Sequence, residues 1–200
     1  MTKNNLLLSG LFLFISFGFA TKTIENEPLT KAAFQTYFYQ ADVLYNLLKA
    51  PSCDGIRFYS ASGQDGSRTI VAISVSNGRD IPNVNYLLYQ GPGINSSIIK
   101  PVNRNTAKNA CSKTPIGQRF AVTFKKHQIE RMLQIPQATG IVFSITNNSG
   151  GYTTLNAMPA LLKEGVINHV SSIDGLTVDD PCPSACGENS NSNYLVQMME

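Results

Sequence analysis

Four cysteines are the side chains of this sequence best suited to chemistry: Cys53, Cys111, Cys182 and Cys186. In an exported chain an even number favours two disulfides, and the sequence leaves three connectivities open. Three residues separate Cys182 from Cys186, which is not the two-residue spacing of thiol–disulfide redox motifs. This spacing fits two ligands of one metal ion, or two half-cystines that are bonded elsewhere.

A zinc site would need further ligands, for which Cys53, His127 and His169 are the candidates. Free or redox-active thiols are the remaining alternative. The chain has no nucleophile elbow, no zincin helix, no phosphate-binding loop and no dinucleotide-binding glycine motif. We therefore name no catalytic residue, cofactor or metal ion, and we expect a protein that is not an enzyme.

Arg57 and Tyr59 are the candidate ligand-binding residues. The segment from Gly55 to Ser60 is predicted to be a strand, with Ile56 and Phe58 facing the core. Arg57 and Tyr59 then share the opposite face, where the pair is suited to hold a carboxylate or a sugar. The alternative is an ordinary solvated face of a β-hairpin.

Charge is distributed unevenly along the chain. Eight basic residues and one acid lie from Lys100 to Arg131, whereas only acids follow Lys163. Either the basic segment binds an anionic partner, such as a polyanionic glycan, a phospholipid or a nucleic acid, or the two segments neutralise each other. The basic residues lack interleaved aromatic residues, which argues against nucleic acid.

An internal repeat positions these residues. Eighty-five residues after the first copy, five residues recur without a gap. The recurring residues are Leu48, Pro51, Gly55, Ile56 and Phe58, which match Leu133, Pro136, Gly140, Ile141 and Phe143. Pro ends a helix in each copy, Gly allows a sharp turn into a strand, and the apolar pair faces the core. Residues 39–76 and 124–158 should therefore superpose.

The predicted fold class is α+β, with two related helix–β-hairpin units packed as one domain and an antiparallel sheet that carries its helices on one face. We expect one helix from about Thr30 to Lys49 and another over residues 125–133. Residues 95–114 are predicted to form a long loop and residues 159–164 a short helix. The domain should span residues 21–187, with repeats at about 29–90 and 115–165 and a flexible tail at 188–200.

The N-terminus has the pattern of a secretory signal peptide. A short polar segment with Lys3 precedes the apolar stretch Leu6–Ala20, and small residues stand at Gly18 and Ala20. We predict cleavage after Ala20, because fifteen residues are too few for a comfortable transmembrane helix. An uncleaved anchor is the alternative. Export would bring the protein to the periplasm, the outer membrane surface or the extracellular space.

Two short motifs carry a resemblance to known sequences. The segment from Cys53 to Tyr59 and the Cys-Pro-Ser-Ala-Cys-Gly segment at 182–187 resemble those of a group of uncharacterised Gram-negative bacterial exported proteins. That group shares a C-x-G-I-R-[IF]-Y strand and a C-terminal C-P-x-x-C-G motif. The resemblance implies that Cys53 lies near Cys182 and Cys186, and it implies no activity.

The sequence therefore predicts an exported, non-catalytic binding or structural module of the bacterial cell envelope. Its expected partner is another envelope component or an anionic ligand. The alternative is a redox or metal-dependent protein centred on Cys53, Cys182 and Cys186.

Overall fold

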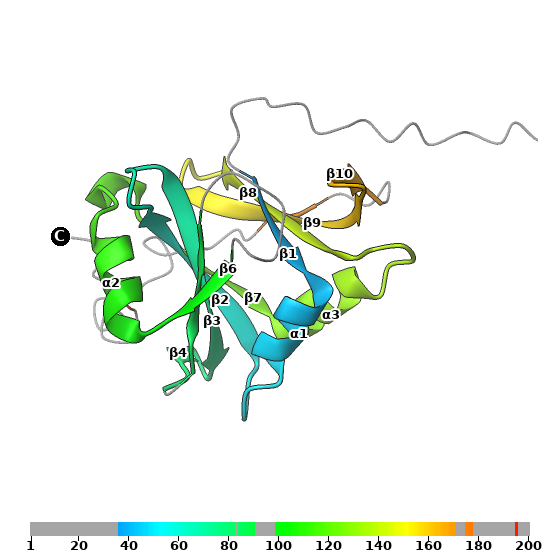
Figure 1. The fold of residues 1–200 in the computed structure, drawn as a ribbon, viewed down its shortest axis with the longest axis horizontal. Coiled ribbons are helices and arrows are strands. Elements are labelled where there is room, and N and C mark those ends of the chain that lie inside the picture. The colour runs from blue at the N-terminus through cyan, green and yellow to red at the C-terminus, as the bar shows by residue number, and fades with distance from the viewer. Residues whose placement is uncertain (1–35, 83, 91–98, 171–174, 178–194, 196–200) are drawn as a thin grey trace, which may run out of the picture.

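The computed structural model describes residues 36–82, 84–90, 99–170, 175–177 and 195. These residues form two antiparallel sheets with helices at their edges and on one outer face (Figure 1). Sheet A contains β1 (Thr36–Gln40), β8 (Gly140–Asn147), β9 (Thr153–Lys163), β10 (Val166–His169) and β11 (Leu176–Thr177). Sheet B contains β2 (Gly55–Ser62), β3 (Arg68–Ser76), β4 (Arg79–Asp80), β5 (Tyr86–Tyr89), β6 (Ile99–Val102) and β7 (Ala121–Lys125).

The helices are short. They are α1 (Ala41–Leu48), α2 (Arg104–Ser112) and α3 (Lys126–Leu133), together with one 3-10 turn, η2 (Ile116–Gln118). Helices α1 and α3 lie side by side and bury their apolar faces in the core between the sheets (Figure 1). Helix α2 packs separately, on the outer face of sheet B. No helix in the described ranges is both long and apolar enough to cross a membrane.

The two copies of the repeat exchange their first strands. Strand β1 of the first copy pairs with β8 of the second, and β7 of the second copy pairs with β2 of the first. The registers are equivalent: Gln40 faces Gly140 where Lys125 faces Gly55, and Tyr37 faces Phe143 where Val122 faces Phe58. Such reciprocal contacts are those of an internal two-fold symmetry.

Gly55 and Gly140 are glycines because the exchanged strands approach them closely. A Cβ atom on Gly55 would lie 2.6 Å from the backbone oxygen of Phe124, and one on Gly140 would collide with the backbone oxygen of Tyr39. The sharp turn before each strand occurs three residues earlier, where Ser52 and Gln137 have positive φ values of 56° and 71°. The glycines are therefore required for strand exchange rather than for the turn that the sequence suggested.

The repeated apolar residues meet in the core. Ile56, Phe58, Ile141 and Phe143 are all fully buried, as predicted. The rings of Phe58 and Phe143 approach to 4.3 Å between centroids across the two sheets. Tyr39 contacts Phe58 at 5.5 Å, and the equivalent pair, Phe124 and Phe143, also lies at 5.5 Å. These four aromatic rings join the two copies at their centre.

The predicted α+β fold class is wrong. The chain is predominantly antiparallel β-structure in two sheets, instead of one sheet with helices on one face. Each unit begins with a strand that pairs with the hairpin of the other unit, so neither helix–hairpin unit forms a separate sheet with its own strands alone. The exchange divides the hydrogen-bonded strands between two sheets, because each hairpin receives its third strand from the other copy.

Three predicted elements also differ from the structure. The described part of the predicted first helix is a strand up to Gln40, because the aromatic run Tyr37–Tyr39 favours extended pairing with β8. Residues 159–164 do not form a helix: they complete β9, and Glu164 and Gly165 turn the chain into β10. The described part of the loop predicted at 95–114 contains β6 and α2.

Candidate functional site

Arg57 and Tyr59 do not lie on an exposed face. Only 2% of Arg57 and none of Tyr59 is accessible to solvent. The strand alternates as predicted, with Tyr59 on the face opposite Ile56 and Phe58. That opposite face is covered by α2 and by Leu195, which belong to a second apolar cluster with Val71, Ile73 and Val75.

The carboxylate that this pair holds belongs to the chain itself. Arg57 donates from Nη1 to Asp80 Oδ1 at 2.9 Å, and the Tyr59 hydroxyl donates to the same carboxylate at 2.8 Å. Arg57 also donates to Thr123 Oγ1 and to the backbone oxygen of Gly78, each at 3.0 Å. The predicted recognition chemistry is therefore present, but its role is internal: it fastens β4 to β2 within sheet B.

Two further side chains extend the network towards the surface. The Tyr86 hydroxyl donates to Asp80 at 3.2 Å and accepts from Arg104 of α2 at 3.1 Å. Burial raises the pKa of Asp80, and the neighbouring Arg57 guanidinium opposes that rise. Burial and the Asp80 carboxylate raise the pKa of Tyr86 to about 12, so its phenol remains protonated. A fully occupied buried network of this kind stabilises one arrangement of strands.

The described cysteines do not form one site. Cys53 is half-buried in the α1–β2 loop and its thiol donates to the backbone oxygen of Gly55 at 3.2 Å. Cys111 is buried on α2, where burial raises its pKa to about 12. Both are free thiols. Cys182 and Cys186 lie outside the described residues, so their proximity to Cys53 stays a prediction.

The histidines are also separate from the cysteines. His127 is exposed on α3, and His169 ends β10 with a buried Nδ1 that has no hydrogen-bond partner in the described part of the chain. Among the residues that the structure describes, no three His, Cys, Asp or Glu side chains are grouped closely enough to hold a metal ion. Cys53 lines a shallow surface cavity with Lys126 and Glu130.

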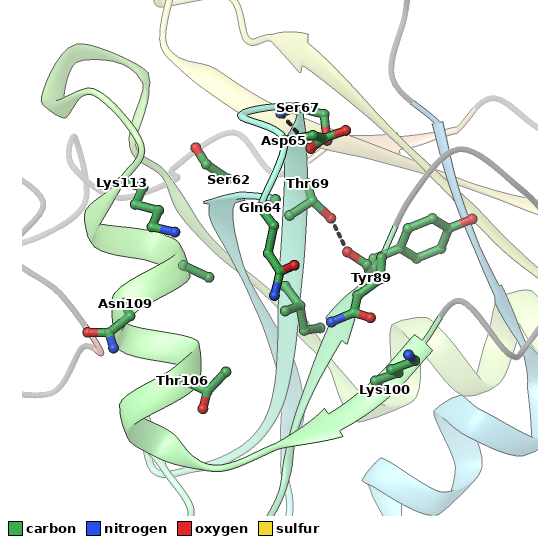
Figure 2. A pocket seen from close by; sticks show the side chains of 14 residues that line it. Ser62, Gln64, Asp65, Ser67, Thr69, Tyr89, Lys100, Thr106, Asn109 and Lys113 are labelled. Carbon is green, nitrogen blue, oxygen red and sulfur yellow. Dashed lines mark hydrogen bonds between the residues drawn. The ribbon is translucent and has the colours of Figure 1, made fainter.

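A larger cavity lies elsewhere, between α2 and the β2–β3 loop (Figure 2). We call it the polar groove. Its volume is about 580 Å³, within the range of about 300–1,000 Å³ typical of small-molecule sites. Thr106, Asn109 and Lys113 come from α2 or its end, and Lys100 comes from β6 (Figure 2). Gln64 extends from the β2–β3 loop between them.

The loop that carries Gln64 is held in one conformation. The N–H of Gly63 donates to the backbone oxygen of Ser67 at 2.8 Å, and Gly66 takes a positive φ of 79°. Asp65 Oδ1 accepts from both the backbone N–H and the hydroxyl of Ser67. These hydrogen bonds lower the pKa of Asp65. A loop fastened in this way presents its outer side chains with little entropy left to lose on binding.

Several polar ends in the groove have no partner within the described residues. The side chains of Gln64, Asn109, Lys100 and Lys113 make no hydrogen bond or ion pair there. Asp65 is the only acid among the described residues that line the groove, and Ser67 already occupies one of its oxygens. The groove therefore combines two cations with uncommitted amides, which is the arrangement expected of a site for a polar, negatively charged ligand.

The sequence analysis missed the groove, although two signals were present. Asn103 is the N-cap of α2, and its side chain accepts from the N–H of Thr106 at 2.9 Å. An Asn that precedes buried Ala107, Ala110 and Cys111 is a recognisable helix start. The second signal is charge: no acid occurs from residue 81 to residue 129, and this stretch supplies one wall of the groove.

Comparison with known protein families, with curated proteins and with solved structures gives no match to this chain. The class that the described residues define is therefore structural: a two-sheet β-protein with an internal repeat, a buried ionic network and one polar groove.

Proposed function

We propose that this protein is an exported, non-catalytic binding module and that the polar groove binds a negatively charged, polar ligand. The observation that carries the proposal is the convergence on one cavity of polar side chains from three separate elements, none of which has a partner among the described residues. Lys100 stands on β6, Lys113 is the C-cap of α2 and Gln64 belongs to the hydrogen-bonded β2–β3 loop, so no single surface helix or strand accounts for them.

Electrostatics supports an anionic ligand. Lys100 and Lys113 come from the long acid-free stretch of the chain, and Asp65 is already engaged by Ser67. A cleft lined with one sign of charge attracts ligands of the opposite sign and raises their association rate. Export is supported by the signal-peptide pattern of residues 1–20, which lie outside the described part of the chain.

The composition of the groove supports binding rather than catalysis. Among the residues that the structure describes, its lining contains no histidine or cysteine, and the hydrogen-bonded Asp65 is the only carboxylate. General acid–base catalysis needs a group whose pKa lies near the working pH. The hydrogen bonds from Ser67 instead lower the pKa of Asp65 and keep it ionised.

The test measures binding to immobilised polymers of defined charge. Mature protein is passed over dextran sulfate, polygalacturonate and unmodified dextran at two salt concentrations. We expect salt-sensitive binding to at least one of the two anionic polymers and none to dextran. Lys100→Gln/Lys113→Gln should weaken that binding by about tenfold or more, because two charge-assisted contacts are lost.

The control variant removes the same charge elsewhere. Lys49→Gln/Lys163→Gln replaces two exposed lysines that do not line the groove. It should bind like the wild type. Equal loss in both double variants would mean that net charge alone drives binding, and the groove would then not be the site. Failure of both anionic polymers to bind would reject the proposal.

A further inference from the structure

The polar groove continues into a second basin across the β2–β3 loop. The second basin has a volume of about 500 Å³ and shares Ser62, Gly63, Gln64 and Lys113 with the first. Each basin alone is large enough for a small ligand. Because the two share one rim, they form an elongated site with the rigid loop as its ridge.

The second basin repeats the chemistry of the first. It adds Arg68, at the start of β3, and Gln118 of η2. Within the described residues the Arg68 side chain has no ion pair, and its backbone oxygen accepts from the Tyr37 hydroxyl. Among the described residues the site therefore has three cations: Lys100 lies in the first basin, Lys113 at the shared rim and Arg68 in the second basin. Cations distributed in this way suit a ligand that repeats its negative charge along a chain.

The other lining side chains favour a carbohydrate. Amides and hydroxyls both donate and accept hydrogen bonds, as sugar hydroxyls do. Gln64, Gln90, Asn109 and Gln118 supply amides, and Ser62 and Thr106 supply hydroxyls.

Two other classes of anionic ligand, lipids and nucleic acids, fit the groove less well. The apolar side chains of the first basin are largely buried, with exposed fractions of 6% for Leu88, 3% for Tyr89 and 8% for Ala110, so these three side chains offer little surface to an acyl chain. The Tyr89 ring points away from α2 and packs on Tyr37, so it cannot stack on a nucleobase (Figure 2).

From these observations we infer that the ligand is a linear acidic oligosaccharide that crosses the β2–β3 loop and occupies both basins. The inference rests on the proposed function, because it specifies the ligand of the same groove. Asp65 and Ser67 hold the loop as the ridge over which the chain passes. Lys113 contacts the chain where it crosses from one basin to the other.

The experiment compares chain lengths by calorimetry. The probes are oligogalacturonates of one to six residues, heparin-derived oligosaccharides of two to eight residues, neutral malto-oligosaccharides and a hexaglutamate peptide. In one of the two acidic series, affinity should rise by about tenfold or more once the chain is long enough to enter both basins, because the second contact becomes intramolecular. Neutral sugars should not bind.

Three variants locate the two basins. Arg68→Gln should reduce affinity for the long acidic chains only, whereas Lys113→Gln should reduce affinity for short and long chains. Lys163→Gln, outside both basins, should have no effect. Circular dichroism and thermal unfolding of each variant establish that it is folded.

The outcomes separate this inference from the proposed function. Affinity that is independent of chain length but sensitive to Lys113→Gln would retain an anion site in the groove and reject the extended saccharide. Tighter binding of hexaglutamate than of either sugar series would replace the saccharide with an acidic peptide. Absence of binding by every anionic probe would reject the inference and the proposed function together.

Discussion

The two halves of the molecule use the same strands in the same register but treat their outer faces differently. On sheet B, positions 57 and 59 are Arg and Tyr, and both are buried: Tyr59 lies in the apolar cluster with α2 and Leu195, and Arg57 pairs with Asp80. On sheet A the equivalent positions are Val142, which is buried in a small apolar cluster, and Ser144, which is only half-buried. The inner faces, in contrast, are both closed by the shared aromatic core.

The difference comes from the segment that the chain adds after each hairpin. After β3, residues 77–120 add β4, β5, β6, α2 and η2 before the second copy begins. That excursion covers sheet B, supplies Asp80 to Arg57, and creates the polar groove along α2. After β9 the described residues add only β10 and β11, which extend sheet A sideways. The repeat thus provides the frame, and the excursion provides the candidate site.

The largest effect should come from breaking the ionic network of sheet B, which has no counterpart among the described residues of sheet A. Asp80→Ala leaves the buried Arg57 without its carboxylate, and we expect a loss of about 3–5 kcal/mol in the free energy of unfolding. Urea denaturation measures this loss. Arg57→Val/Asp80→Val, which imitates Val142 of sheet A, should cost less than the sum of its single variants. A loss below about 1 kcal/mol for Asp80→Ala would mean that the network contributes little.

The next largest loss of stability should come from replacing the glycine at the start of β2 or of β8, and it should be equal in the two copies. Gly55→Ala and Gly140→Ala each place a Cβ against the backbone oxygen of an exchanged strand, and backbone cannot move aside as a side chain can. We expect each to destabilise the protein by about 3 kcal/mol in denaturant unfolding. Gly117→Ala, where a Cβ meets no atom within 4 Å, is the neutral control. Tolerance of one substitution and not the other would contradict equivalent strand exchange.

A smaller effect should come from Leu195, which has no described counterpart on sheet A. Its side chain is 3% exposed and its N–H donates to the Tyr59 hydroxyl at 3.1 Å. Leu195→Ala should cost about 2 kcal/mol. It should also speed alkylation of Cys111, which belongs to the same cluster. Mass spectrometry follows that modification, and Leu162→Ala on sheet A is the control that should leave the Cys111 rate unchanged.

The smallest change in stability should come from a core position at which the two copies differ by a hydroxyl group. Tyr39 and Phe124 are equivalent, but the Tyr39 hydroxyl is buried without a hydrogen-bond partner among the described residues. Tyr39→Phe makes the two copies alike, and we expect it to be neutral or to stabilise the protein by up to about 1 kcal/mol. Thermal and urea unfolding measure the change. Phe124→Tyr is the reciprocal variant and should destabilise, whereas a clear loss in Tyr39→Phe would indicate a partner for the hydroxyl.

The amino-acid sequence by itself determined the positions of the repeated elements and their core. Leu48 and Leu133 end equivalent helices, Gly55 and Gly140 begin equivalent strands, and the apolar pairs next to these glycines are buried. These features are local: a proline after a helix and alternation along a strand act over a few residues. The turn chemistry of residues 63–67 and the strand at Tyr86–Tyr89 were predictable for the same reason.

Only the tertiary structure decided which strands pair and which faces are covered. Nothing in residues 36–40 specifies β8 as their partner, since pairing across about a hundred residues depends on the whole core. Exchange of β1 and β7 made two sheets instead of one. Packing of α2 then covered Tyr59 and brought Lys100, Lys113 and the β2–β3 loop together as a groove. Charge and side-chain chemistry are properties of residues, whereas exposure and convergence are properties of the fold.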